Sequence, residues 1–112
     1  MKREVRLTES ASSDVGSILR WLKARSPQGA ATWRACLEGL LRELESGLRA
    51  WPLAPEADGL GEPLYQALFR TPRGRPYRVL FVIRSVTVFV VHLRGPGQDL
   101  LPSDELQLPD RS

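Results

Sequence analysis

The chain has 112 residues, of which 42% are hydrophobic and 26% are charged, a composition typical of one globular domain rather than of a disordered chain. No apolar run approaches the roughly 20 residues of a membrane helix, and no hydrophobic stretch follows the charged first residues as in a secretory signal. The only cysteine, Cys36, excludes a disulfide within the chain and a cysteine-cluster metal site. We therefore expect a cytoplasmic protein that uses no metal ion or other cofactor.

The net charge of +3 is unevenly distributed along the chain. Between residues 63 and 98 there is no Asp or Glu, and all six basic residues of this stretch are arginines: Arg70, Arg73, Arg75, Arg78, Arg84 and Arg94. The remainder of the chain is net acidic. Because a guanidinium group presents a planar fork of donors that suits phosphate or carboxylate, this stretch predicts a polyanion or an acidic protein as partner.

The N-terminal half predicts one strand followed by two helices. Residues 3–8 alternate apolar and polar side chains, as a half-buried strand does. Apolar residues between Val15 and Leu22 recur at helical spacing, which predicts a first helix over about residues 12–25. The candidate N-caps of this helix are Ser10, Ser12 and Ser13.

A second helix is predicted to begin at Pro27, with Ser26 as its N-cap, because proline fits the first helical position. An apolar stripe continues from Ala30 to Leu48, and Gly47 is suited to ending the helix near that point. Only a few residues separate the two helices, so they should pack as an antiparallel αα-hairpin.

The C-terminal half predicts three strands after a loop rich in Pro and Gly at 51–63. The strands are expected at 64–70, 77–84 and 87–94. Consecutive strands with short links form an antiparallel meander. The predicted fold is therefore α+β, in the order β-α-α-β-β-β, with an antiparallel sheet packed on the αα-hairpin. A single domain is expected over 1–102, followed by a flexible acidic tail at 103–112.

The last two strands are apolar on both faces at their middle, in the runs 79–83 and 88–91. Two helices cover only one face of such a sheet. The other face is covered by the loop or the tail, or it is open to a separate protein. We favour the open face, edged by arginine.

The register of these strands decides whether their polar residues meet. A three-residue connection, Ser85 to Thr87, puts Arg94 opposite Arg78 on one face, whereas a two-residue connection separates them, since a slip of one residue turns every side chain over. The sequence leaves both registers open. We favour the first on the hypothesis that an anion lies between the two arginines, because like charges so close are otherwise unfavourable.

Two motifs, "YRVLF" (77–81) and "VVHLRG" (90–95), preceded by "LYQALFRTPRGR" (64–75), resemble the RelE/ParE superfamily of toxins from type II toxin–antitoxin modules. In element order the resemblance extends from Val5 to about Leu101. It implies a compact β-α-α-β-β-β fold and a cognate antitoxin that wraps the toxin. Relatives of the RelE kind cut mRNA on the ribosome, and relatives of the ParE kind act on DNA gyrase.

The resemblance also implies site residues. Arg78 lies where RelE-like enzymes place an arginine that stabilises the scissile phosphate, and His92 and Arg94 lie on the last strand, where many members keep His or Arg. These three are the candidate catalytic residues, with His92 as base or acid and the arginines holding the phosphate. The candidate RNA- or antitoxin-binding residues are Arg70, Arg73, Arg75 and Arg84. After the last strand the chain departs from the pattern, because "GPGQDLL" has no basic residue or tyrosine.

Three hypotheses about function follow. We favour a RelE-like, metal-free endoribonuclease acting on ribosome-bound mRNA. The alternatives are a ParE-like toxin that inhibits gyrase without cutting anything, and a relative that has lost toxicity. All three predict an antitoxin that lies over the open apolar face and offers Asp or Glu to the arginines.

Overall fold

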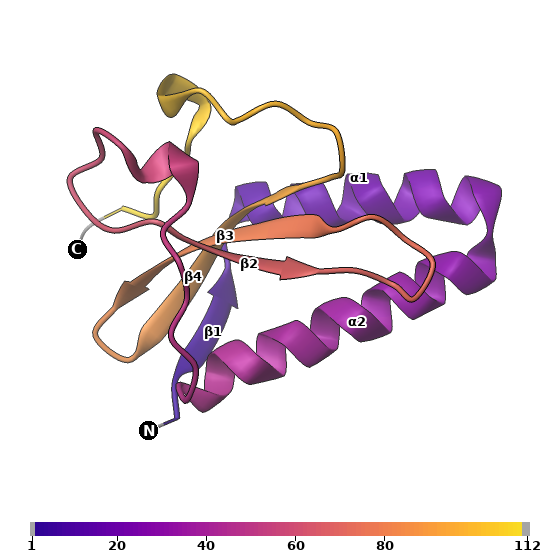
Figure 1. The fold of residues 1–112 in the computed structure, drawn as a ribbon, viewed down its shortest axis with the longest axis horizontal. Helices are drawn as coiled ribbons and strands as arrows, with labels where there is room; N and C mark the ends of the chain where they lie inside the picture. Colours follow the sequence, from indigo (N-terminus) through magenta and orange to yellow (C-terminus); the bar gives the residue numbers. More distant parts are fainter. Residues whose placement is uncertain (1, 111–112) are drawn as a thin grey trace.

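The computed structural model describes residues 2–110, with the side chain of residue 103 left aside. The elements are β1 (Glu4–Leu7), α1 (Glu9–Arg25), α2 (Pro27–Ser46), β2 (Tyr65–Phe69), β3 (Tyr77–Arg84) and β4 (Thr87–Arg94) (Figure 1). Single turns of 3-10 helix occur at Pro55–Ala57 and Ser103–Glu105. This order confirms the predicted α+β fold.

The four strands form one sheet in the order β1-β4-β3-β2. The three C-terminal strands make the predicted antiparallel meander. The N-terminal strand β1 joins the free edge of β4 and runs parallel to it, with Val5 paired to Val88. The sheet is therefore mixed, and not antiparallel throughout as expected. The two helices form the long crossover that parallel neighbours need.

The ends of the helices have local causes. Helix α1 begins earlier than predicted because the Thr8 hydroxyl, not a serine, accepts a hydrogen bond from the Ala11 N–H at 3.2 Å. Helix α2 begins as predicted, with Ser26 as N-cap and Pro27 in the first turn, and it ends at Gly47, whose φ of 67° is left-handed. Among residues 2–110, no helix has the length and apolar composition needed to cross a membrane.

The main core lies between the helices and one face of the sheet. Trp33, Leu37 and Leu44 from α2 pack on this face, together with Ala11 from α1. The sheet contributes Ala67, Val79, Phe81, Val88, Val90 and Leu93 to the same cluster. This is the predicted packing of an amphipathic helical hairpin on a sheet.

The expectation of an open apolar face is wrong. Leu80 and Val82 of β3 and Val91 of β4 form a second cluster on the face away from the helices, and all three are fully buried. The segment between α2 and β2 crosses this face beside the C-terminal segment (Figure 1). The covering residues are Ala54, Ala57, Leu60, Leu64, Leu106 and Leu108. The chain thus removes from water the apolar surface that its helices cannot reach.

The tail after residue 102 contributes to this cover. Leu106 and Leu108 pack against the second cluster, and the Gln107 side chain accepts a hydrogen bond of 2.6 Å from the Ser10 hydroxyl. The division into a domain at 1–102 and a flexible tail at 103–112 stays a prediction about motion, and residues 111–112 lie outside the described part. In the structure, Leu106 and Leu108 of this tail lie against the sheet.

The register of β3 and β4 differs from both alternatives. Arg84 pairs with Thr87, so the connection has two residues and the favoured three-residue connection is wrong. A β-bulge at Leu80/Phe81 then inserts Val91 into β4, and this extra residue reverses the alternation of side chains beyond it. As a result Arg94 does lie opposite Arg78, as predicted, for a reason that the sequence did not reveal.

The covered face yields a test of stability. Leu80→Ala should cost about 3 kcal/mol of unfolding free energy, because it leaves a cavity beneath the loop and tail. Urea denaturation of the purified protein measures this cost. Leu68→Ala on β2 is the matched control, since Leu68 is 56% exposed and should cost little. Equal small costs for both variants would show that the second face is open to water.

Candidate functional site

Arg78 forms an ion pair with a carboxylate of its own chain. Its Nη1 donates to Glu56 Oε2 at 3.0 Å, its Nη2 donates to Glu56 Oε1, and its Nε donates to Gln66 Oε1 at 3.1 Å. The Glu56 side chain is 2% exposed and that of Arg78 is 18% exposed. This two-pronged geometry is the strong form of an arginine–carboxylate contact. Arg78 therefore has a carboxylate partner within the chain, which the sequence did not predict, and its catalytic role stays a prediction.

Glu56 also holds the C-terminal segment. Its Oε2 accepts a hydrogen bond of 3.1 Å from the backbone N–H of Leu101. Burial by itself raises the pKa of Glu56, but the hydrogen bonds from Arg78 and Leu101 and the attraction of the guanidinium outweigh it, and the pKa lies below its usual 4.5. Glu56 is therefore an anion at neutral pH that joins the loop, β3 and the tail.

Arg84 is engaged at the opposite end of β3. Its Nη2 donates to Glu62 Oε1 at 2.5 Å and its Nε to Glu62 Oε2 at 3.2 Å. Its Nη1 reaches the carbonyl oxygen of Pro109 at 2.8 Å. Six residues of strand, or about 20 Å, separate Arg84 from Arg78. The structure therefore does not bring Arg84 together with the other candidate residues.

His92 is 8% exposed and lies between α1 and the tail. Its Nε2 accepts a hydrogen bond of 3.1 Å from the backbone N–H of Gln107, so the ring proton belongs on Nδ1. Nδ1 lies 3.4 Å from Asp14 Oδ2, which also accepts a hydrogen bond of 2.9 Å from the Leu93 N–H. These groups border a surface hollow of about 400 Å³. Both ring nitrogens of His92 already face partners within the chain.

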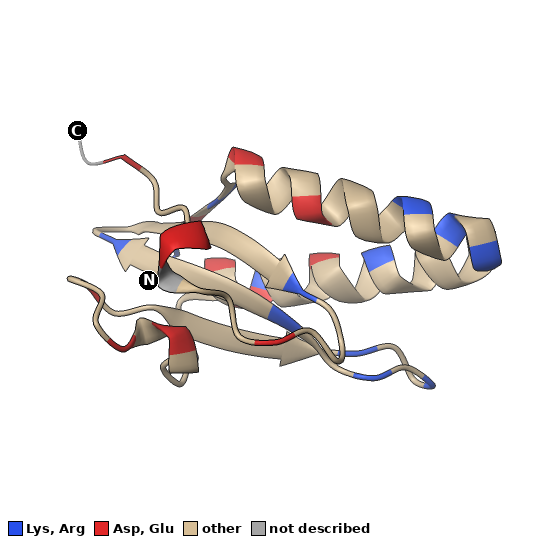
Figure 2. Ribbon diagram, turned by 90° about the horizontal axis from the view of Figure 1, so that it is seen from above, with Lys and Arg blue, Asp and Glu red and all other residues tan. Residues whose placement is uncertain are grey.

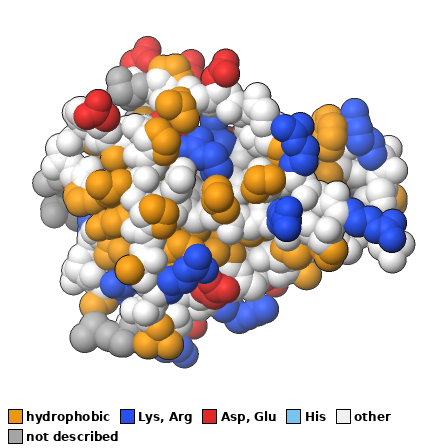
Figure 3. Space-filling view, in the orientation of Figure 1, with side chains coloured by type: hydrophobic (Ala, Val, Ile, Leu, Met, Phe, Trp, Pro, Cys, Tyr) orange, Lys and Arg blue, Asp and Glu red, His pale blue; other side chains and the backbone are white. Residues whose placement is uncertain are grey.

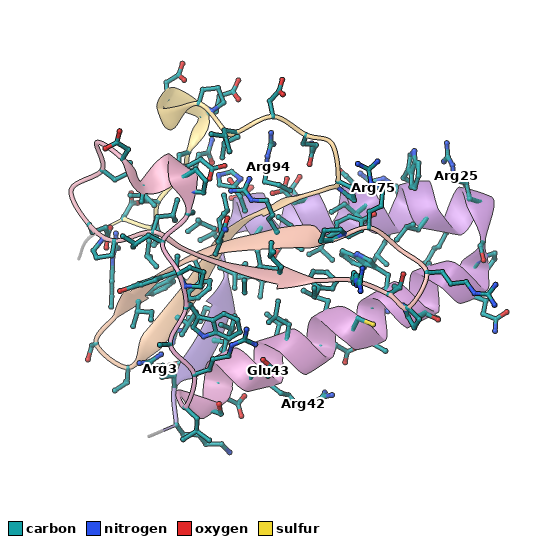
Figure 4. The ribbon with its side chains drawn as sticks, viewed as in Figure 1. Arg3, Arg25, Arg42, Glu43, Arg75 and Arg94 are labelled. Carbon is teal, nitrogen blue, oxygen red and sulfur yellow. The ribbon has the colours of Figure 1, made fainter. Side chains whose placement is uncertain are left out.

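Arg94 is held by backbone rather than by a carboxylate. Its Nη2 donates to the Asp99 carbonyl oxygen at 2.8 Å, and Figure 4 shows the side chain beneath the segment that follows β4. Its Nε is buried and has no hydrogen-bond acceptor within residues 2–110. No ion pair joins Arg94 to a carboxylate in that part of the chain. Arg94 is thus the candidate catalytic arginine whose charge is least neutralised.

The remaining candidates lie on the connection between β2 and β3. Arg70, Arg73 and Arg75 are exposed, and none of them makes an ion pair with the described acidic residues. A hydrogen bond of 3.0 Å from the Gly74 N–H to the Thr71 carbonyl tightens this turn. Of the four residues predicted to bind RNA or antitoxin, these three remain open to a ligand and Arg84 does not.

Sequence reasoning missed the partners of the candidate residues. Glu56 and Glu62 sit in the loop before β2, Asp14 sits on α1, and Gln107 sits in the tail. None of them carries a periodic signal, because loops and helix ends do not reveal which distant strand they meet. The one available signal was a lone glutamate in the apolar loop stretch "LAPEA". Within residues 2–110, no three His, Cys, Asp or Glu side chains come together as a metal site.

A family model described as "ParE toxin of type II toxin-antitoxin system, parDE" matches residues 5–100. No curated protein is a significant match to the chain. The matched region includes the hairpin and the sheet except for Glu4, the first residue of β1, together with Glu56, Arg78, His92 and Arg94. The tail residues that cover the second face, Leu106 and Leu108, lie beyond it.

The Glu56–Arg78 pair predicts a pH-dependent stability. Glu56→Gln should cost on the order of 3 kcal/mol at pH 7, because it leaves a mostly buried guanidinium without its counter-charge. The pKa of Glu56 is lowered in the folded state, so its contribution is complete above the unfolded value near 4.5 and is lost as the pH falls through the folded value. The gap between variant and native protein should therefore shrink below pH 4.5.

Urea denaturation at pH 7, 5, 4 and 3 measures that gap. Glu43→Gln is the control, because Glu43 pairs with Arg49 on the surface with 55% of its side chain exposed, and its loss should cost about 0.5 kcal/mol or less. A Glu56→Gln penalty that stays constant from pH 7 to pH 3 would contradict the assignment of Glu56 as an anion.

Proposed function

Because the chain belongs to the ParE family of type II toxin–antitoxin toxins, we propose that it inhibits DNA gyrase by binding and cuts no nucleic acid itself. The observation that carries this proposal is that the chain's own groups occupy the candidate catalytic side chains. Arg78 is paired with Glu56, and both nitrogens of His92 face groups of the same chain. We expect it to act in the cytoplasm and to be neutralised by its antitoxin.

The chemistry of RNA cleavage supports this choice. Attack by a 2′-hydroxyl needs a base, positive donors around the phosphate and an acid for the leaving oxygen. A phosphate approaching Arg78 would meet the negative charge of Glu56 and would have to displace a buried, two-pronged ion pair. A binding toxin has no such requirement, since its surface alone acts on the target.

A RelE-like endoribonuclease acting on ribosome-bound mRNA is the second candidate. One observation favours it: Arg94 lies opposite Arg78, its Nε is buried without an acceptor among the described residues, and His92 lies two positions before it. Three of the groups that this chemistry needs are thus close together on the sheet. Departure of the tail would remove Gln107 from His92 Nε2 and free that nitrogen to act as a base.

A supercoiling assay separates the two candidates. The purified protein should inhibit the supercoiling of relaxed plasmid by gyrase, while mRNA on programmed ribosomes stays intact in a parallel reaction. Both readings come from one preparation, whose folding is checked by circular dichroism, so failure of a folded sample in both would favour the relative that has lost toxicity. Cleaved mRNA together with unaffected gyrase would overturn the proposal in favour of the endoribonuclease.

Arg94→Gln gives a second prediction, because it removes the least neutralised candidate charge without breaking an ion pair among the described residues. For a binding toxin, growth arrest on expression and gyrase inhibition should both persist. For an endoribonuclease, loss of a phosphate-stabilising donor should lower the cleavage rate by roughly a hundredfold or more. Circular dichroism of the purified variant checks that it folds.

A further inference from the structure

Positive charge gathers at the end of the molecule where the helices are joined. Residues 15–37 and 63–77 contain no Asp or Glu, and together they hold seven of the sixteen basic residues. The first stretch includes the junction of α1 with α2, and the second includes the connection of β2 with β3. Basic residues mark this end in Figure 2, and in the view of Figure 3 no acidic side chain is visible there. The field at this end favours an anion.

An aromatic hollow of about 460 Å³ opens at this end. Trp21, Trp33 and Tyr77 line it, and Arg73 and Arg75 reach it from the β2–β3 connection. Trp21 is 53% exposed, so the hollow presents aromatic surface to solvent. The Arg25 guanidinium lies over one face of the Trp21 ring, 3.7 Å from its centre, and adds positive charge there.

Trp33 forms a fixed part of the wall of the same hollow. Its side chain is 1% exposed and packs against the rings of Phe69 and Tyr77, which fixes its place. Its indole Nε1 is buried and has no hydrogen-bond acceptor within the described residues, so Trp33 contributes ring surface to the hollow rather than a donor.

A second hollow of about 460 Å³ adjoins the first at the start of α2. The two share Gly29, Thr71 and Arg73 in their lining, so they lie side by side. Ser26 and Gln28 line the second hollow at the helix N-terminus, where the helix dipole favours a negative charge. Pro27 has no N–H and the Gly29 N–H donates to the Ser26 hydroxyl, so the Gln28 N–H is the first-turn donor left for an anion. Arg73 stands between the aromatic hollow and this one.

We propose that the two hollows hold one nucleotide of a single-stranded nucleic acid. The base lies in the aromatic hollow, against Trp21 and Tyr77, and its phosphate lies at the start of α2 beside Arg73. A nucleotide joins a flat ring to an anion, and the paired hollows offer a stacking surface beside an anion site in the same way. An acidic protein segment would use the arginines equally, but it has no general need of an aromatic floor. The inference does not depend on gyrase as the target, because it concerns the isolated chain.

Fluorescence anisotropy of a labelled, unstructured twelve-nucleotide RNA or DNA tests this site. The native protein should bind it. Arg73→Gln/Arg75→Gln should weaken binding at least tenfold and reduce the salt slope by about 0.7, since the phosphate contact of Arg73 is lost. The matched control is Arg3→Gln/Arg42→Gln, which removes the same charge at the end of the molecule far from Arg25 and Arg75 (Figure 4). Equal weakening by the two double variants would overturn the site.

The base is tested separately from the phosphate. Trp21→Ala should weaken oligonucleotide binding roughly tenfold, because it removes a stacking surface, and should leave the binding of inorganic polyphosphate unchanged. Equal binding of polyphosphate and oligonucleotide, with no effect of Trp21→Ala, would overturn the proposal in favour of a merely charged surface. Displacement of the oligonucleotide by polyglutamate of equal charge at equal concentration would overturn it in favour of an acidic protein. Oligonucleotide binding without gyrase inhibition would leave this site standing and reject the proposed function alone.

Discussion

The ion pair of Arg78 with Glu56 is the interaction on which the second face of the sheet depends. Taking both charges out of water is costly. The cost is offset by the two-pronged contact, by the hydrogen bond that Arg78 donates to Gln66 and by the one that the Leu101 N–H donates to Glu56. Those bonds hold the loop, β3 and the tail in one place. The loop and tail lie over Leu80 and Val82, and the contacts of Arg84 with Glu62 and Pro109 hold the same cover at the other end of β3.

The residue inserted in β4, Val91, decides which side chains at the end of that strand lie on the covered face. Without the bulge at Val91, the two-residue connection would put the Arg94 side chain on the face that the helices cover, whereas Arg78 lies on the other face. The bulge returns Arg94 to the side of Arg78 and leaves His92 at the border of α1 and the tail. The arrangement that resembles a catalytic cluster thus comes from an irregularity in β4, while the regular part of the strand builds the core.

The sequence predicted the elements because their signals are local. Helical spacing, the Ser26–Pro27 start and the Gly47 end each act within one turn, and all three agree with the structure. The bulge could not be predicted, because an uninterrupted run of valine and phenylalanine looks the same whichever face each residue occupies. The partners of the arginines could not be predicted either, since Glu56 lies 22 residues from Arg78 in a loop without periodicity.

The arginines divide into two groups with different consequences. Arg78 and Arg84 have carboxylate partners in their own chain, so their charges stabilise the fold and are unavailable to a ligand. Arg73 and Arg75 make no such pair among the described residues, and they stand beside exposed aromatic surface at the end of the helical hairpin. We therefore propose the hairpin end, rather than the sheet, as the place of the anion recognition that the sequence suggests, because exposed arginines and stacking surface coincide there.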